Sequence, residues 1–290
     1  MILERLYQPN EGELIYHYCR AEAFLEIIKS RTIWQSAYYV LNDSMEREWG
    51  YSIFTKVAKQ LHDEIGEASE TFLRHIDAIA RMAYSSSMAM ISSYSLDGDV
   101  LSQWRAYADN GRGFAIGFSA KLMQMPAKQL RVLYDKDTQI RELLGNLKHI
   151  YEYEKSIGFK FDDQFQSHCA NLALDLCAYK NPAFREEKEI RLVHVSGVAP
   201  EGQSKKIVAL GARDQDGKRL SDPIEIRFRI SDGVAIPYVV LDYTNGRIAS
   251  PIKEVVLGPR NENSTSNIGF FLNTIGMLGV TIRRSSASYR

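Results

Sequence analysis

The sequence has few cysteines, no excess of charge of either sign and no long run of apolar residues. Its three cysteines, Cys19, Cys169 and Cys177, have neither the number nor the spacing of a disulfide framework or a metal site. No stretch approaches the ~20 apolar residues of a membrane-spanning helix, and the charged N-terminal segment does not resemble a signal peptide. We therefore expect a cytoplasmic protein with reduced thiols and no membrane partner.

The charges balance, because Lys and Arg number 36 and so do Asp and Glu. A chain without net charge has no global field to attract nucleic acid, although a local basic patch could still bind it. Nucleic acid therefore stays open as a partner without being indicated by charge. The 290 residues are enough for a sizeable core in one large domain or two small ones.

Common catalytic motifs are also missing. The sequence contains no HExxH, GxSxG or CxxC, and the histidines at positions 62, 75, 149, 168 and 194 lack the spacing of metal ligands. Gly111 and Gly113 permit tight backbone geometry before a strand, but they do not form GxGxxG or a P-loop. We expect no metal.

Along the chain, segments with a strand pattern alternate with segments with a helix pattern. Side chains that alternate between two faces predict a strand at 14–18. Strand-like segments follow at 32–36, 87–95, 113–118, 130–134, 188–196, twice within 224–243, at 252–259 and at 280–286. Helical spacing predicts helices after residue 20, over 53–83 with a break near Gly66, around Trp104, and at 138–157, 161–180 and 265–278. Asp43 and Glu46 form a capping-box pattern, and the polar segment 197–222 predicts a loop.

No linker divides the chain. We therefore expect a single α+β domain over residues 1–290, with a helical hairpin inserted at about 137–180.

His17 ends the first strand, which runs directly into a helix. A lone histidine is more often packed in a core, where its ring nitrogens are hydrogen-bonded. Ligand-binding edges, however, also tend to lie where a strand meets a helix. Both interpretations stay open for His17.

Glu187, Glu189 and Arg191 lie two residues apart in the segment FREEKEIRLV. On a strand, this spacing places all three side chains on one face. They could form a surface ion-pair ladder. Equally, they could line a cleft in which a carboxylate stabilises a cationic centre and the arginine binds a phosphate.

Trp104 and Tyr107 lie three residues apart in the segment SQWRAYADNGRGFAIGF, on one face of a helical turn. Aromatic residues in this pattern belong more often to a core than to a ring-stacking site. Arg105 and Arg112 flank them and could contact a phosphate.

These segments occur in an order that resembles a known bacterial family. The succession YHY, LNDSMERE, SQWRAYADNGRGFAIGF, AFREEKEIRLV, IKEVVLGP and SSASYR is similar, over nearly the whole chain, to domain-of-unknown-function family 2971. The family name implies no activity.

Two segments are also similar to ADP-ribosyltransferases. The strand that ends in His17, with the helix AFLEIIKSRTIW after it, resembles the start of the DNA-modifying toxin group, and EIRLV resembles the strand of the catalytic glutamate. This resemblance implies an ADP-ribosyltransferase-like split antiparallel sheet with flanking helices, and NAD as the substrate. It also suggests a bacterial toxin or a phage-defence effector.

The resemblance implies roles for individual residues. Glu189 would be the catalytic carboxylate, Glu187 would orient or activate an acceptor, and His17 would bind the adenosine ribose, with Tyr18 beside it. Arg191 or Arg105 would hold the pyrophosphate, and Trp104 or Tyr107 would pack on a ring. The family's middle residue is not placed, since both Tyr107 and the strand Ser93-Tyr94-Ser95 are candidates.

Two alternatives to this enzyme remain. One is a non-catalytic module that binds a nucleotide or a peptide on the same fold. The other is a nuclease or phosphotransferase that uses Glu187, Glu189 and His17 on RNA, against which the neutral charge counts. A small-molecule nucleotide is the expected ligand, whereas the acceptor of any transfer stays unknown.

Overall fold

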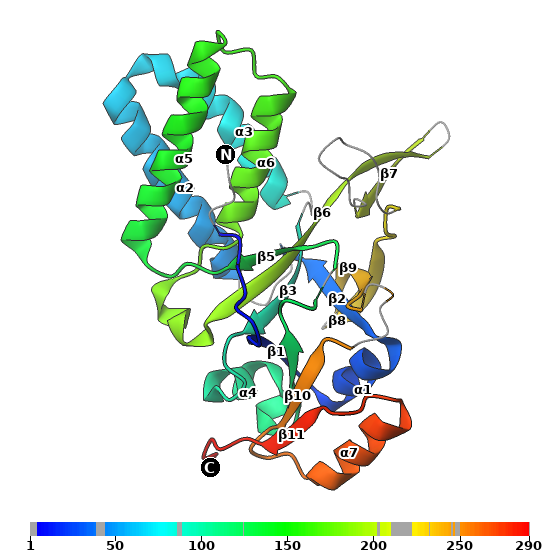
Figure 1. The fold of residues 1–290 in the computed structure, drawn as a ribbon. Helices are drawn as coiled ribbons and strands as arrows, with labels where there is room; N and C mark the ends of the chain where they lie inside the picture. The colour runs from blue at the N-terminus through cyan, green and yellow to red at the C-terminus, as the bar shows by residue number, and fades with distance from the viewer. Residues whose placement is uncertain are drawn as a thin grey trace.

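The computed structural model describes residues 5–38, 44–85, 89–123, 125–201, 204–209, 222–231, 233–244, 246 and 250–289. A branched sheet occupies one part of the molecule and a bundle of helices another (Figure 1). The expected α+β class is therefore confirmed. None of the described helices is long and apolar enough to cross a membrane.

The sheet links eleven strands through shared pairs, all antiparallel except β10 with β11. Its main order is β11-β10-β4-β1-β3-β2-β9-β8, while β6 pairs with β3, β5 and β7. The strands are β1 (Leu14–Cys19), β2 (Thr32–Ala37), β3 (Ala89–Ser95), β4 (Phe114–Ser119), β5 (Lys128–Arg131), β6 (Glu189–Glu201), β7 (Ser204–Ala209), β8 (Arg227–Ser231), β9 (Val234–Asp242), β10 (Ile252–Leu257) and β11 (Thr281–Arg284).

The sheet divides at β3. One edge of β3 pairs with β6 along its whole length, from Ala89 to Ser95. The other edge pairs with β2 only at Met90 and Ile91, and with β1 only at Ser95. Strands β1 and β2 thus leave β3 as two separate arms, and we call the gap between them, at residues 92–94, the fork.

The arm that begins with β1 is covered on both faces. Helices α1 (Ala21–Ser30) and α7 (Thr265–Thr274) lie on one face, where Phe24 stacks on Phe114 with ring centroids 4.1 Å apart. Helix α4 (Leu101–Tyr107) lies beside the same arm and packs Trp104 against Tyr18 (Figure 1). The apolar spacing in α1 explains this packing, because Phe24, Ile27 and Ile28 are the residues that it buries.

Four helices form a bundle with its own core. They are α2 (Ser44–Ile65), α3 (Glu70–Ser85), α5 (Lys136–Ser156) and α6 (Asp163–Leu176). Their buried residues, such as Phe54, Phe72, Leu147 and Phe165, form a cluster apart from the main core of the sheet. The expected hairpin at 137–180 is therefore half of a larger unit, which it builds together with α2 and α3 (Figure 1).

Most expected elements are confirmed, and one segment differs. The predicted loop at 197–222 is wrong in part, because β6 continues to Glu201 and pairs with β7. At the end of β7, Val208 and Ala209 are buried and Ile207 is exposed. Residues 202–203 and 210–221 of the predicted loop lie outside the described residues. The break near Gly66 is confirmed, whereas Asp43 of the capping-box pattern lies outside the described residues.

Gly113 permits a close approach between β1 and β4. A Cβ atom at this position would lie 2.1 Å from the carbonyl oxygen of Cys19, so no other residue fits there. Gly111 adopts φ +83°, which other residues rarely adopt. The tight backbone geometry that the sequence predicts at these two glycines is therefore confirmed.

Candidate functional site

Four charged side chains meet at the start of β6, where all are buried: Lys180, Glu187, Glu189 and Arg191. The Lys180 Nζ atom lies 2.5 Å from Glu187 Oε2 and 3.0 Å from Glu189 Oε2. Arg191 donates from Nε and Nη2 to the two oxygens of Glu189, at 2.8 and 3.0 Å. We call these four residues the ionic cluster. Its two positive and two negative charges cancel.

The cluster depends on a turn just before β6. The 3₁₀ helix Pro182–Glu187 ends at Lys188, which adopts a left-handed conformation with φ 45°. Glu187 is consequently not on the strand, and its expected position on one strand face with Glu189 and Arg191 is wrong. The turn nevertheless brings Glu187 back to Lys180. It also directs the Lys188 side chain outward to Asp97, 3.2 Å away.

Segments distant in the sequence hold the cluster in place. The backbone N–H of Glu189 donates to the Tyr134 hydroxyl at 3.0 Å, and Arg191 Nη1 donates to the Cys177 carbonyl at 2.6 Å. Gln139 donates to the Lys180 carbonyl at 2.9 Å. The charged groups are therefore fixed by the residue that follows α6, by Tyr134 before α5 and by the first turn of α5.

Glu189 is held in its ionised form. Burial by itself would raise the pKa of this carboxyl, but the charges of Arg191 and Lys180 and hydrogen bonds from Arg191 and Ser93 outweigh burial and lower the pKa to about 2. Burial raises the pKa of the adjacent Tyr134 hydroxyl, so that group stays neutral. At neutral pH, the site presents a fixed carboxylate.

Ser93 connects this carboxylate to the fork. It lies opposite Arg191 on β3, and it is the one exposed residue of that strand. Its side chain is hydrogen-bonded to Glu189. Because residues 92–94 have no strand partner on the fork side, Ser93 is the point at which the cluster meets the surface.

His17 points away from Glu189. Tyr16 lies opposite Ser95, and Ser95 lies opposite Glu189, so these three side chains share one face of the sheet. His17, the next residue on β1, points to the other face, where its ring lies 5.4 Å from that of Tyr94. The resemblance assigns His17 and Glu189 to one NAD site, but the structure places the two side chains on opposite faces of the sheet.

His17 has a structural task at the fork. Its Nδ1–H donates to the Ser93 carbonyl oxygen at 3.0 Å, which supplies the hydrogen bond that a strand partner would otherwise provide. Burial lowers the pKa of His17, although this hydrogen bond opposes the change. The histidine stands at the strand end because the sheet divides there.

The side chains of Tyr18 and Trp104 are buried and do not face solvent, where a ligand could contact them. The Tyr18 hydroxyl donates to the Asp97 carbonyl at 2.8 Å and accepts from the Val100 N–H at 2.9 Å. Trp104 is fully buried, and its Nε1–H donates to Asp99 at 2.8 Å. Neither presents a ring face for a ligand, so the structure does not place these two expected cofactor-binding residues at a surface.

The remaining expected cofactor-binding residues are dispersed. Arg191 is buried against Glu189, so it does not present its guanidinium to a pyrophosphate. Arg105 and Tyr107 are exposed on α4, and the Arg105 guanidinium lies 5.3 Å from the ring of Tyr289. Of the sequence candidates, Glu187, Glu189 and Arg191 come together at the start of β6, whereas Tyr18 and Trp104 pack on each other beside α4.

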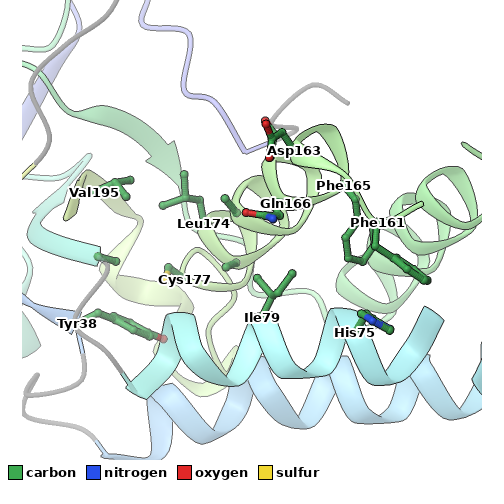
Figure 2. Close-up of a pocket in the computed structure, with 14 residues that line it drawn as sticks. Tyr38, His75, Ile79, Phe161, Asp163, Phe165, Gln166, Leu174, Cys177 and Val195 are labelled. Carbon is green, nitrogen blue, oxygen red and sulfur yellow. The ribbon is translucent and has the colours of Figure 1, made fainter. Parts of the chain in front are cut away.

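A cavity of about 690 Å³ lies next to the cluster, between α3, α6, the start of β3 and the middle of β6. Tyr38, Leu174, Cys177 and Val195 gather at one end, and His75 lies toward the other (Figure 2). The lining is mainly apolar, and the volume is typical of small-molecule sites. The cavity borders the cluster, because Cys177 accepts a hydrogen bond from Arg191 and the Tyr38 ring lies 5.8 Å from its guanidinium.

Lys180 is the member of the cluster that sequence reasoning missed. A signal was present, because this lysine follows the apolar run that ends α6, where burial requires a carboxylate partner. Across the part of the chain that the structure describes, no group of three or more His, Cys, Asp or Glu residues could hold a metal ion.

Comparisons with known proteins cover part of the chain. Searches of curated proteins and of solved structures found no match. The family likeness expected over nearly the whole chain extends over one segment, which contains Trp104 and the entire ionic cluster. Residues 103–192 match the family described as protein of unknown function (DUF2971).

Proposed function

We propose that the protein is an NAD-dependent ADP-ribosyltransferase-like enzyme whose reaction takes place at the fork, with Glu189 as the catalytic carboxylate. The observation that carries the proposal is the contact between Glu189, held ionised by Arg191 and Lys180, and the exposed Ser93. The division of the sheet at this point agrees with the split sheet that the resemblance implies.

The geometry of Glu189 suggests how a ribose would approach. A carboxylate offers about four lone-pair positions. Arg191 takes two of them and Lys180 a third, which leaves one position toward the Ser93 hydroxyl. Since Ser93 is exposed, a ribose hydroxyl of NAD would reach Glu189 by replacing or sharing this bond. Ser93 would then be the middle residue of the family pattern.

The chemical step breaks the bond between the ribose C1′ and the nicotinamide nitrogen. The bonding electron pair leaves with neutral nicotinamide, and positive charge develops on the ribose. The fixed carboxylate of Glu189 stabilises this charge, an effect worth about 3–4 kcal/mol for a preorganised group. An acceptor lone pair then forms the new bond to C1′, and the acceptor releases its proton to water.

Other residues would act through Glu189. Lys180 joins Glu187 to Glu189, so Glu187 would orient the catalytic carboxylate instead of activating the acceptor. His17 would hold the Ser93 backbone in place from the opposite face.

A second function also has an observation in its favour. The charges of the ionic cluster cancel, and its members are buried and bonded to one another. A closed network of this kind suits a module that binds a nucleotide at the fork without cleaving it. Binding of NAD without nicotinamide release would support this alternative.

One experiment separates the two functions. The protein is incubated with NAD, nicotinamide release is measured by chromatography, and the melting temperature is recorded with and without NAD. The enzyme releases nicotinamide, and Ser93→Ala slows the release. The binding module gains stability from NAD but releases nothing. Neither stabilisation nor release would contradict both functions.

A further inference from the structure

The cavity beside the ionic cluster lies between the helical bundle and the sheet. Helices α3 and α6 form its bundle side, and Tyr38, Ala89 and Val195 form its sheet side (Figure 2). Ala89 pairs with Val195 at one end of the contact between β3 and β6, whereas Ser95 and Glu189 pair at the other end. The cavity is therefore a separate hollow from the fork.

One face of α6 gives the cavity its space. The residues of α6 that line the cavity recur every three or four positions, and Ala170 and Ala173 lie in the middle of this face. Protein interiors are closely packed, and an alanine side chain is a single methyl group, so the space that a larger side chain would fill stays open here. The hollow thus results from the sequence of this helix.

The same face changes in character along the helix. Asp163, Gln166 and Ser167 lie near its start, where they are exposed and offer oxygen atoms that accept hydrogen bonds. Leu174 and Cys177 lie at the other end and are buried (Figure 2). Burial raises the pKa of the Cys177 thiol to about 12, so this end stays uncharged. A ligand in the cavity would meet a polar mouth and an apolar interior.

Aromatic rings near the mouth hold one another in place. Phe161 stacks on His75 with ring centroids 4.1 Å apart, and it meets the ring of Phe165 edge-on with centroids 4.9 Å apart. Such contacts fix the positions of the rings. An apolar ligand would therefore enter a site that is already formed.

The charge of the lining indicates which ligand fits. Among the described residues that line the cavity, Asp163 is the one Asp, Glu, Lys or Arg. A phosphate or a carboxylate would find no lysine or arginine there, so nucleotides and fatty acids fit poorly. A protonated amine, in contrast, can donate N–H groups to Asp163, Gln166 and Ser167 at the mouth.

We propose that this cavity binds an apolar small molecule that carries one amine, with the amine at Asp163 and the apolar body directed toward Cys177. The inference does not depend on the proposed function, because the cavity and the fork are separate. The ligand would contact both the bundle and the sheet, so it should also stabilise the folded protein.

The test uses the whole protein and an uncharged fluorescent probe, N-phenylnaphthylamine, whose emission rises in an apolar site. Octylamine, octanol and octanoate, which share one chain length, are compared as competitors. We expect octylamine to displace the probe at about tenfold lower concentration than octanoate, with octanol between them. Absence of probe binding, or displacement by octanoate at the same or a lower concentration than octylamine, would overturn the inference.

Asp163→Asn isolates the contribution of the charge. The variant should bind the probe like the wild type, because the probe is uncharged. Octylamine and octanol should then displace the probe at concentrations within about twofold of each other. An undiminished preference for octylamine in this variant would overturn the inference.

Ala170→Trp should fill the cavity, because half-buried Ala170 lies in the middle of the lining face. We expect probe binding to weaken at least about tenfold, and about threefold in Ala170→Leu, which fills less space. Ala23→Trp is the matched control, since Ala23 is an exposed alanine of α1 that does not line the cavity.

Circular dichroism establishes that each variant is folded, and Ala170→Leu replaces Ala170→Trp in the comparison if the latter does not fold. The control should bind the probe like the wild type. Undiminished affinity in the folded Ala170 variant, or an equal loss in Ala23→Trp, would overturn the inference.

Discussion

The ionic cluster at the start of β6 and the exposed Trp34 of β2 lie in one sheet, yet their surroundings are opposite. The members of the cluster are at most 8% exposed, and they pair with one another. Trp34 is 48% exposed, and its ring contacts the side chains of Tyr238 and Arg229. The charges of the ionic cluster are paired within the protein, whereas much of Trp34 contacts solvent.

Because of this difference, substitutions in the ionic cluster should affect stability, whereas a substitution of Trp34 should mainly affect the binding of a ligand. A buried ion whose partner is removed becomes an uncompensated charge, so each member of the cluster is needed for folding. An exposed aromatic side chain already contacts water in the folded protein, so its loss affects a ligand more than the fold. The two groups can therefore be distinguished by changing one side chain in each.

The largest effect on stability should come from Lys180→Met. The substitution keeps an apolar stem but leaves Glu187 and Glu189 with Arg191 as the one cation of the cluster. We expect the free energy of unfolding in urea to fall by about 3–5 kcal/mol.

Lys188→Met is the matched control for this loss. The Lys188 side chain is 56% exposed and pairs with Asp97 at the surface, so its removal should cost less than about 1 kcal/mol. Equal losses in the two variants would show that the cluster contributes no more than a surface ion pair.

Acid should weaken the cluster in a defined pH range. The pKa of Glu189 lies below its ordinary value of 4.5, at about 2, so ionised Glu189 favours the folded state. Its contribution is complete above pH 4.5, and it is lost as the pH falls toward 2. Urea unfolding of the wild type should show a loss of up to about 3 kcal/mol over this range.

Glu189→Gln serves as the comparison for the acid series. It has no carboxylate to protonate at this position, so its stability should be lower at neutral pH and should depend less on pH below 4.5. The same slope in both proteins would mean that other carboxyl groups cause the loss.

His17→Ala should have a smaller effect on the free energy of unfolding. His17 contacts the fork at Ser93. The substitution removes the donor to the Ser93 carbonyl and should cost about 1–3 kcal/mol of unfolding free energy. His75→Ala is the control, because exposed His75 donates to a carbonyl within its own helix. A loss no greater than in His75→Ala would show that the fork does not need this hydrogen bond.

The sequence was a good guide to local structure. Alternation predicted β1, a strand-like segment predicted β2, and helical spacing predicted the two helices separated at Gly66. It also placed Glu189 and Arg191 on one strand face. These features follow from neighbours along the chain, which periodicity records directly.

The arrangement of the candidate site depended on contacts between distant segments. The face to which His17 points is set by the pairing of Tyr16 with Ser95, which no local pattern reveals. Glu187 lies before β6 and not on it, because Lys188 adopts a left-handed conformation. Lysine seldom adopts this conformation. The exposure of Trp34 could have been predicted, because its side chain points to the face of β2 opposite to that of the buried Ile33 and Gln35.

The most direct test of the central claim, that the carboxylate beside Ser93 breaks the nicotinamide–ribose bond, is nicotinamide release from NAD by the wild type and by Glu189→Gln. Both are assayed at a temperature at which circular dichroism shows them folded. We expect release by the wild type and none above the uncatalysed rate by the variant. Equal release by the two folded proteins, or none by the wild type, would contradict the claim.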